Sequence, residues 1–79
     1  LSCHGSGYKF ESYGLFWFRQ TPGSNPEWVC VIWASNTANY GEEWKDRATV
    51  SRDNSQSRSF LELRDLRPQD SARYFCAVT

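Results

Sequence analysis

Residues 16–28 read FWFRQTPGSNPEW, which is three aromatic side chains in a row, a polar turn and a further tryptophan. The prolines fix φ and the glycine permits a reversal, so residues 21–26 are predicted to join two strands as a hairpin. Because successive side chains of a strand point to opposite faces, Trp17 lies on one face and Phe16 and Phe18 lie on the other. The first strand of this hairpin is therefore apolar on both faces, although one apolar face is enough to build a core.

Short apolar alternations recur along the chain at intervals of roughly ten residues, separated by clusters of Gly, Pro, Ser and Asn. Aromatic residues make up 16 % of the 79 residues, and the whole pattern is typical of an all-β sandwich. We expect one domain, residues 1–79, with strands near residues 1–5, 15–20, 27–33, 37–40, 47–52, 57–64 and 72–78.

The segment SFLELRDLRPQD, residues 59–70, fits two secondary structures. A helix would gather its apolar residues at three- and four-residue spacing, whereas a strand would align Ser59, Leu61 and Leu63 on one face. The proline disfavours helix at the residue before it and leaves room for a turn or two at most. The strand is therefore preferred, and Leu66 is expected to fill the core where the chain turns.

The charges of the chain are balanced, with nine Lys and Arg residues against nine Asp and Glu residues. This balance provides no electrostatic footprint for nucleic acid or for an anionic membrane, and neither is expected as a partner of this domain. No run of about 18 apolar residues is present, and the chain starts at LSC without a charged segment followed by an apolar one. A membrane span or an export signal would therefore lie outside this sequence.

The positions of the three cysteines help to distinguish a secreted protein from a cytosolic one. Cys3 and Cys76 lie near the two ends of the chain, and Cys30 lies between them. A bridge between the outer pair would close nearly the whole chain, a loop for which the chain-entropy estimate is about 4 kcal/mol of stabilisation. The alternative is that all three are buried or free thiols of a cytosolic protein. If the bridge forms in a secreted chain, Cys30 has no partner among the other two cysteines, and its partner is expected elsewhere.

The outward face of the predicted sheet is rich in aromatic rings. The same alternation sends Phe75 to the face opposite Tyr74. Together with Phe16, Phe18 and Trp28, it would form an exposed patch of a few hundred Å², and patches of that size usually mark association sites. The alternative is a second core layer covered by the chain's own loops. Too few residues remain to supply that cover, so we expect a second protein to bind this face.

A Cys…Trp…Cys pattern is present as Cys3, Trp17 and Cys76, and Tyr74 precedes the second cysteine by two residues, as in a tyrosine corner. Around it stand four blocks in order, namely WFRQTPG at 17–23, PEWV at 26–29, RATVSRDNSQS at 47–57 and LRPQDSARYFCA at 66–77. With these blocks the chain resembles an immunoglobulin variable domain of the heavy-chain type. The resemblance implies a two-sheet V-type sandwich, truncated so that the strand before Leu1 and the last strand are missing.

The resemblance also implies roles for framework residues. It places Phe18, Gln20, Trp28 and Phe75 where heavy-chain variable domains pack against a light-chain variable domain, with the Gln20 amide pairing across the pseudo-twofold axis. With Phe16 and Pro26 these residues make up the expected partner interface. The implied core residues are Leu15, Trp17 and Tyr74. The implied framework ion pairs are made by Arg47 and Asp70, with Arg19 and Glu27 close by; the alternative is solvated surface charges worth at most about 1 kcal/mol.

Two segments match hypervariable loops, GYKFESYG at residues 7–14 and IWASNTA at residues 32–38. Their rigid amphipathic rings and adaptable polar groups are typical of antigen-binding surfaces. The expected antigen-binding residues are Tyr8, Lys9, Glu11, Ser12, Tyr13, Trp33, Ser35, Asn36 and Asn39. For any one of them the alternative is a merely solvent-exposed loop position. Phe10 is expected to anchor the first loop from beneath, and a third loop would start after Cys76.

Several residues depart from the family pattern. Pro26 stands where Leu is usual and removes a side-chain knob and a backbone donor, which is expected to alter the partner interface. Phe18 replaces the usual Val, a change also seen in antibodies that dispense with light chains, whereas the retained Trp28 argues for a conventional partner. Trp44 is bulkier than the Val common there. Cys30 takes a position that is normally Gly, Ala or Ser, so it is either bridged to a cysteine of the third loop or a buried free thiol.

The sequence contains no constellation for catalysis. A nucleophile needs a base and an orienting group, and a tetrahedral zinc site needs about four ligands. His4 is the single histidine, and GSG at residues 5–7 lacks the rest of a phosphate-binding motif. We therefore expect no enzymatic activity, no metal site and no cofactor.

The resemblance implies antigen recognition as an antibody heavy-chain variable domain that is extracellular, either secreted or anchored to the plasma membrane through regions outside this chain. One alternative is a T-cell-receptor chain that uses a heavy-like variable segment, because the ending CAVT lacks the common Arg or Lys after CA. The other is a V-set cell-surface adhesion or inhibitory receptor, whose fixed loops would bind one cognate protein.

Overall fold

The fold consists of short β-strands and single 3₁₀ turns. The computed structural model describes residues 1–5 and 9–79. Within these ranges the strands are β1 (Ser2–His4), β2 (Leu15–Gln20), β3 (Glu27–Ile32), β4 (Ala38–Tyr40), β5 (Ala48–Asp53), β6 (Arg58–Leu63) and β7 (Arg73–Val78). The 3₁₀ turns are η1 (Phe10–Ser12), η2 (Asn54–Gln56) and η3 (Pro68–Asp70).

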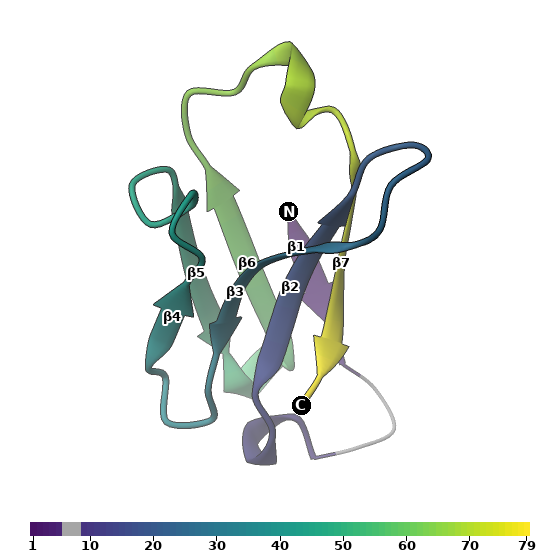
Figure 1. The fold of residues 1–79 in the computed structure, drawn as a ribbon. Coiled ribbons are helices and arrows are strands. Elements are labelled where there is room, and N and C mark those ends of the chain that lie inside the picture. Colours follow the sequence, from purple (N-terminus) through teal and green to yellow (C-terminus); the bar gives the residue numbers. More distant parts are fainter. Residues whose placement is uncertain (6–8) are drawn as a thin grey trace.

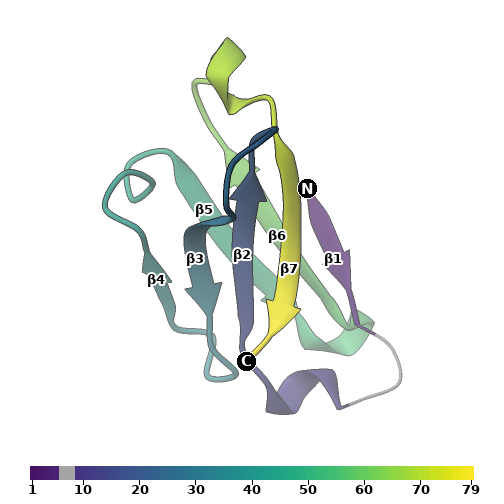
Figure 2. The same cartoon turned by 45° about the vertical axis from the view of Figure 1, so that its right-hand side comes forward.

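The strands form two antiparallel sheets that face each other (Figures 1 and 2). One sheet has three strands in the order β1-β6-β5, and the other has four in the order β4-β3-β2-β7. The predicted all-β sandwich is confirmed, and each predicted strand is present with its ends displaced by a residue or two at most. The ambiguous segment at residues 59–70 is a strand followed by a 3₁₀ turn, as preferred.

Trp17 lies at the centre of the four-stranded sheet and points into the sandwich. It is paired with Cys30 of β3 on one side and with Cys76 of β7 on the other, and it is only 2 % exposed. The disulfide between Cys3 and Cys76 joins the two sheets beside it, with a Cα–Cα distance of 6.5 Å. The indole Nε1–H of Trp17 donates to Ser59 Oγ at 3.2 Å, so the tryptophan is also bonded to the opposite sheet.

The pairing of β2 and β3 contains a β-bulge. The pairing shifts between Trp17 and Phe18, because Trp17 is opposite Cys30 whereas Phe18 is opposite Trp28. Val29 is thus the extra residue, and both Val29 and Cys30 are buried in the core. The bulge lets two consecutive residues of β3 contribute to the interior while the Phe18 and Trp28 pair stays on the outer face.

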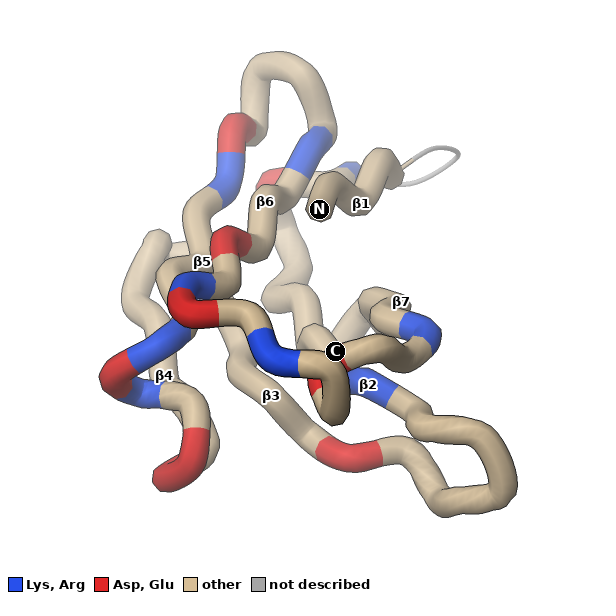
Figure 3. The backbone as a smooth tube through the Cα atoms, turned by 90° about the horizontal axis from the view of Figure 1, so that it is seen from above, with Lys and Arg blue, Asp and Glu red and all other residues tan. Residues whose placement is uncertain are grey.

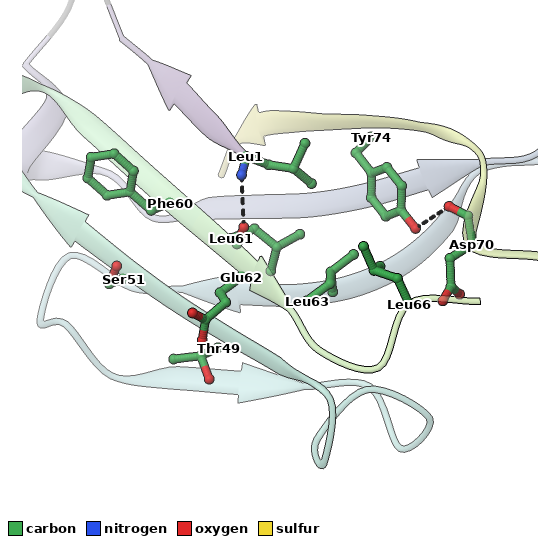
Figure 4. A pocket seen from close by; sticks show the side chains of 10 residues that line it. All are labelled: Leu1, Thr49, Ser51, Phe60, Leu61, Glu62, Leu63, Leu66, Asp70 and Tyr74. Carbon is green, nitrogen blue, oxygen red and sulfur yellow. Dashed lines mark hydrogen bonds between the residues drawn. The ribbon is translucent and has the colours of Figure 1, made fainter. Parts of the chain in front are cut away.

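The expectation for Leu66 is wrong, because its side chain is 69 % exposed instead of filling the core. The turn after β6, with Asp65 at φ 52°, carries Leu66 to the rim of a hollow of about 710 Å³. Figure 4 shows Leu63, Leu66 and Tyr74 around this hollow. Strand β1 pairs with β6 as far as Phe60, and Leu1 exchanges two hydrogen bonds with the backbone of Leu61. No strand among the described residues covers the edge of β6 beyond Leu61.

Replacing Ser59 by alanine should destabilise the protein. Ser59 is fully buried, accepts the Trp17 indole N–H and donates to the Ser51 carbonyl at 3.0 Å. Its loss leaves both groups without that partner, which costs about 1–3 kcal/mol. The free energy of unfolding from urea denaturation measures this loss. The matched control is Ser51→Ala, which keeps the accepting carbonyl and removes an exposed hydroxyl; an equal loss in both variants would contradict the assignment.

Candidate recognition surfaces

The outer face of the four-stranded sheet carries an array of aromatic rings. Phe18 and Phe75, opposite each other on β2 and β7, stack with ring centroids 5.5 Å apart and planes inclined at 21°. Phe16 lies 6.0 Å from Phe18 along β2. Trp28 of β3 is paired with Phe18 and is 38 % exposed. We call Phe16, Phe18, Trp28 and Phe75 the aromatic face.

The remaining residues of the expected interface border the aromatic face. Gln20 is half-buried at the end of β2, and its Nε2 donates to the Ser24 carbonyl at 3.0 Å within the same hairpin. Pro26 is exposed just before β3. Arg73 places its guanidinium 4.8 Å from the Phe75 ring centroid. The aromatic face is thus bordered by polar groups of the β2–β3 hairpin and of β7.

The described parts of the two candidate antigen-binding segments, residues 9–14 and 32–38, lie together at one end of the sandwich, the lower end in Figure 1. The first segment contains η1, whose Phe10 is buried under it. Arg52 of β5 holds this turn, because its Nη2 donates to the Phe10 carbonyl at 2.8 Å and its guanidinium lies 4.7 Å from the Phe10 ring centroid. A second bond from Arg52 reaches the Ile32 carbonyl at 3.4 Å, so one side chain bonds both segments.

The second segment is a tight connection between β3 and β4. The Trp33 N–H donates to the Thr37 carbonyl, and the Asn36 N–H donates to the Trp33 carbonyl, both at 2.8 Å. Asn36 has φ 74°, a left-handed conformation that asparagine tolerates better than most residues. The Ser35 hydroxyl donates to Thr37 Oγ1 at 3.1 Å, and Trp33 Nε1–H donates to Asn39 Oδ1 at 2.8 Å.

The structure brings most of the expected antigen-binding residues to this end with exposed side chains. The exposed ones are Lys9, Glu11, Ser12, Tyr13, Trp33, Ser35, Asn36 and Asn39. Tyr8 lies outside the described residues. Sequence reasoning missed Arg52, since a single arginine at the end of a predicted strand carries no signal for the carbonyls that it binds. It also missed Gly14, whose environment is described below.

At the opposite end, Asp70 joins two arginines. Its carboxylate accepts hydrogen bonds from Arg47 and, at 3.1 Å, from Arg19, while Arg19 also bonds Glu27 at 2.9 Å. The Arg67 N–H donates to Asp70 Oδ2 at 2.9 Å, and the Tyr74 hydroxyl donates to the Asp70 carbonyl at 2.8 Å. The Arg47 hydrogen bond first, and then the Arg67 N–H, hold the pKa of Asp70 below its usual range. This carboxylate therefore connects the turn before β7 to β2 and to the turn that precedes β5.

Trp44 belongs to the same end of the domain. Its ring is 2 % exposed, and the guanidinium carbons of Arg19 and Arg47 lie 4.5 Å and 5.3 Å from its centroid. The large side chain at this position therefore packs directly against both arginines that bind Asp70, an arrangement that favours ordered guanidinium groups. The sequence pattern did not predict the contact between Trp44 and the two arginines.

Cys30 is a free thiol in the described chain and is completely buried in the core. It points to the same side as Trp17, toward the opposite sheet. Burial raises the pKa of the Cys30 thiol to about 12. This placement favours the buried-thiol alternative over a bridge to a loop.

Acidic and basic positions of the described residues are interspersed along the backbone (Figure 3). The described residues contain no group of three or more His, Cys, Asp and Glu side chains that could hold a metal ion. In the same ranges, no helix has the length and apolar character needed to cross a membrane. The two candidate recognition surfaces are the aromatic face and the end of the sandwich that carries residues 9–14 and 32–39, which we call the loop end.

Residues 1–79 match the sequence profile of the immunoglobulin V-set domain, and the chain belongs to this family. It is similar to the mouse (Mus musculus) protein "Ig heavy chain V region MOPC 141", with 40 % identity over 77 residues. The match covers 98 % of this chain and 54 % of the relative, so the chain spans about half the length of that curated relative. The family is non-enzymatic, and this domain is not an enzyme.

Asp70 should contribute more to stability than Glu27, because its side chain is 4 % exposed and accepts from two arginines, whereas that of Glu27 is 46 % exposed. Asp70→Asn should lower the melting temperature by several degrees, and the control Glu27→Gln should cost at most about 1 kcal/mol. Because the folded pKa of Asp70 is lowered, its stabilisation is complete above the unfolded pKa of about 4 and decreases as the pH falls through the folded value.

Urea denaturation of the protein and of Asp70→Asn across a pH series measures this difference. The gap in free energy of unfolding between the two should narrow only at acidic pH. A gap that is constant down to the lowest pH at which the protein folds would contradict the role of the carboxylate charge.

Cys30 should resist alkylation in the native protein. With a pKa of about 12, its thiolate fraction near pH 8 is on the order of a thousandfold below that of an ordinary thiol, and the side chain is inaccessible. Ser35→Cys places an exposed thiol on the second segment as the control. Iodoacetamide labelling followed by mass spectrometry should modify the Ser35→Cys thiol rapidly and modify Cys30 only in urea. Recovery of Cys30 in a disulfide without reduction would show the bridge instead.

Proposed function

We propose that this chain is part of an antibody heavy-chain variable domain that binds antigen through its loop end and pairs with a light-chain variable domain through the aromatic face. The observation that carries the proposal is the aromatic face itself. Its rings stack on one another and Trp28 remains 38 % exposed on the outer side of the four-stranded sheet. The likeness to a heavy-chain V region supports the same conclusion.

A flat array of rings on one sheet is suited to protein association. Aromatic side chains are enriched at the centres of protein interfaces and bury large areas with few rotatable bonds. Phe18 and Phe75 are already ordered by stacking, so a partner domain meets a surface that loses little conformational entropy on binding. The bordering Gln20 and Arg73 would form the polar rim of such an interface.

The loop end supports ligand binding without chemistry. Its exposed residues combine Tyr13 and Trp33 with short polar and charged side chains, the composition of an antibody paratope. The segments are carried by rigid strands and held by Arg52, so their backbones are positioned before a ligand arrives. The disulfide that staples the sandwich fits an oxidising, extracellular setting, either secreted or at the cell surface.

Association with a light-chain variable domain tests this function. The full-length protein that carries this chain is co-expressed with a panel of light chains, and the dissociation constant of the pair is measured by titration. Trp28→Ala should weaken the pair by about fivefold or more, since truncating a central aromatic costs more than about 1 kcal/mol. Phe60→Ala is the matched control, because Phe60 is similarly exposed, at 39 %, but belongs to the other sheet.

Equal weakening by both substitutions, or no association with any light chain, would contradict the proposed pairing. Association with a T-cell-receptor variable domain in place of a light chain would assign the chain to that receptor class. Homodimerisation through the aromatic face, lost in Trp28→Ala, would show that the face binds a second copy and would also contradict the light-chain proposal.

A further inference from the structure

Gly14 lies where three segments of the loop end meet. It is buried between η1 and β2, beside the Trp33 ring and the Ile32 carbonyl of the second segment and beside Thr79, which follows β7. The Gly14 N–H donates to Thr79 Oγ1 at 3.2 Å, and the Thr79 N–H donates to the Gly14 carbonyl at 3.0 Å. The backbone of Gly14 is thus hydrogen-bonded to Thr79 and lies against Trp33 and Ile32.

A glycine is required at position 14 because there is little room for a side chain, and not because of its backbone conformation. Among the described glycines only Gly23 has a positive φ, so the backbone of Gly14 would accept alanine. A Cβ at Gly14 would lie 2.9 Å from Thr79 Cγ2, 3.1 Å from Trp33 Cε3 and 3.2 Å from the Ile32 oxygen. These distances are shorter than van der Waals contact, and rotating Thr79 away would break its bond to the Gly14 N–H.

Trp33 is held by hydrogen bonds and by a ring contact, and it remains 40 % exposed. Its indole N–H is bonded to Asn39, and its ring meets Phe16 edge-on at 6.2 Å with an interplanar angle of 72°. Its backbone N–H and carbonyl are both bonded within the tight connection. Its ring also occupies the space beside Gly14, since Trp33 Cε3 would lie only 3.1 Å from a Cβ at that position.

We propose that Gly14 is a positioning residue that fixes Trp33 as the apolar anchor of the ligand-binding surface. The ligand is a protein or peptide that places an apolar or aromatic side chain on the indole. An immobilised and exposed tryptophan binds such a group at low entropic cost. The indole N–H is satisfied by Asn39, so the ring presents carbon surface to the ligand. The inference rests on the proposed function for the existence of a ligand, but the positioning of Trp33 by Gly14 does not.

The first test reads the position of Trp33 without a ligand. Gly14→Ala in the full-length protein that carries this chain should shift the Trp33 indole N–H resonance and speed its hydrogen exchange by about tenfold or more, because displacement weakens the bond to Asn39. Gly41→Ala is the matched control. Its Cβ would lie no closer than 3.3 Å to any atom, and Gly41 is bonded to Val29 at the other end of β3.

A second variant separates the two short contacts. Thr79→Ser removes Cγ2 and keeps the hydroxyl, so Gly14→Ala/Thr79→Ser retains only the crowding of Trp33 and Ile32. The indole resonance should stay displaced in this double variant. Full recovery of the native resonance, or no displacement in Gly14→Ala, would overturn the positioning role.

The second test uses cyclic peptides selected from a random phage-displayed library on the full-length protein that carries this chain. Trp33→Ala and Gly14→Ala should each weaken a selected peptide by about tenfold or more, and the double variant should bind no worse than Trp33→Ala, since both act through one side chain. Gly41→Ala should change binding by less than about twofold. Peptides that carry no essential apolar side chain, or that bind Trp33→Ala unchanged, would overturn the anchor. Failure to select any peptide would count against the proposed function alone, because the indole resonance still decides the positioning.

Discussion

The fold depends on the burial of Trp17 between a disulfide and a hydroxyl. Trp17 is opposite Cys30 and Cys76 in the strand register, and its indole N–H donates to Ser59 of the opposite sheet. In a domain of this size the hydrophobic core is thin, so a covalent link and a satisfied buried hydrogen bond carry an unusual share of the stability. Fixing Trp17 inward also fixes Phe16 and Phe18 outward, because strand side chains alternate.

The two ends of the sandwich are built from different chemistry. At the end with η3, one carboxylate joins two arginines that also pack on Trp44, which locks the turn before β7. At the loop end, Arg52 binds carbonyls and Trp33 is bonded to Asn39, so the segments are ordered through backbone and amide groups. Charge pairs stabilise the end with η3. At the loop end, the exposed rings and polar groups remain accessible to the proposed ligand.

The aromatic face and the loop end are physically continuous. Phe75 stacks on Phe18, Phe18 contacts Phe16, and Phe16 meets Trp33 edge-on. The proposed partner surface and the proposed ligand anchor therefore share one row of packed rings along β2. This arrangement explains why β2 is apolar on both faces: its inner residues build the core, and its outer residues connect the two proposed recognition surfaces.

The sequence by itself determined the strands and the inward Trp17, because alternation and turn residues are local signals. The family entered as a resemblance, carried by the Cys…Trp…Cys pattern and by four framework blocks that are read directly from the one-dimensional sequence. It failed for Leu66, whose apolar character says nothing about whether a neighbouring strand covers it. Only the tertiary structure decided the roles of Arg52, Trp44 and Gly14, since their partners come from distant strands and loops. The physical reason is that periodicity specifies which face a side chain occupies, whereas contact between loops depends on how the two sheets pack and on the space left between them.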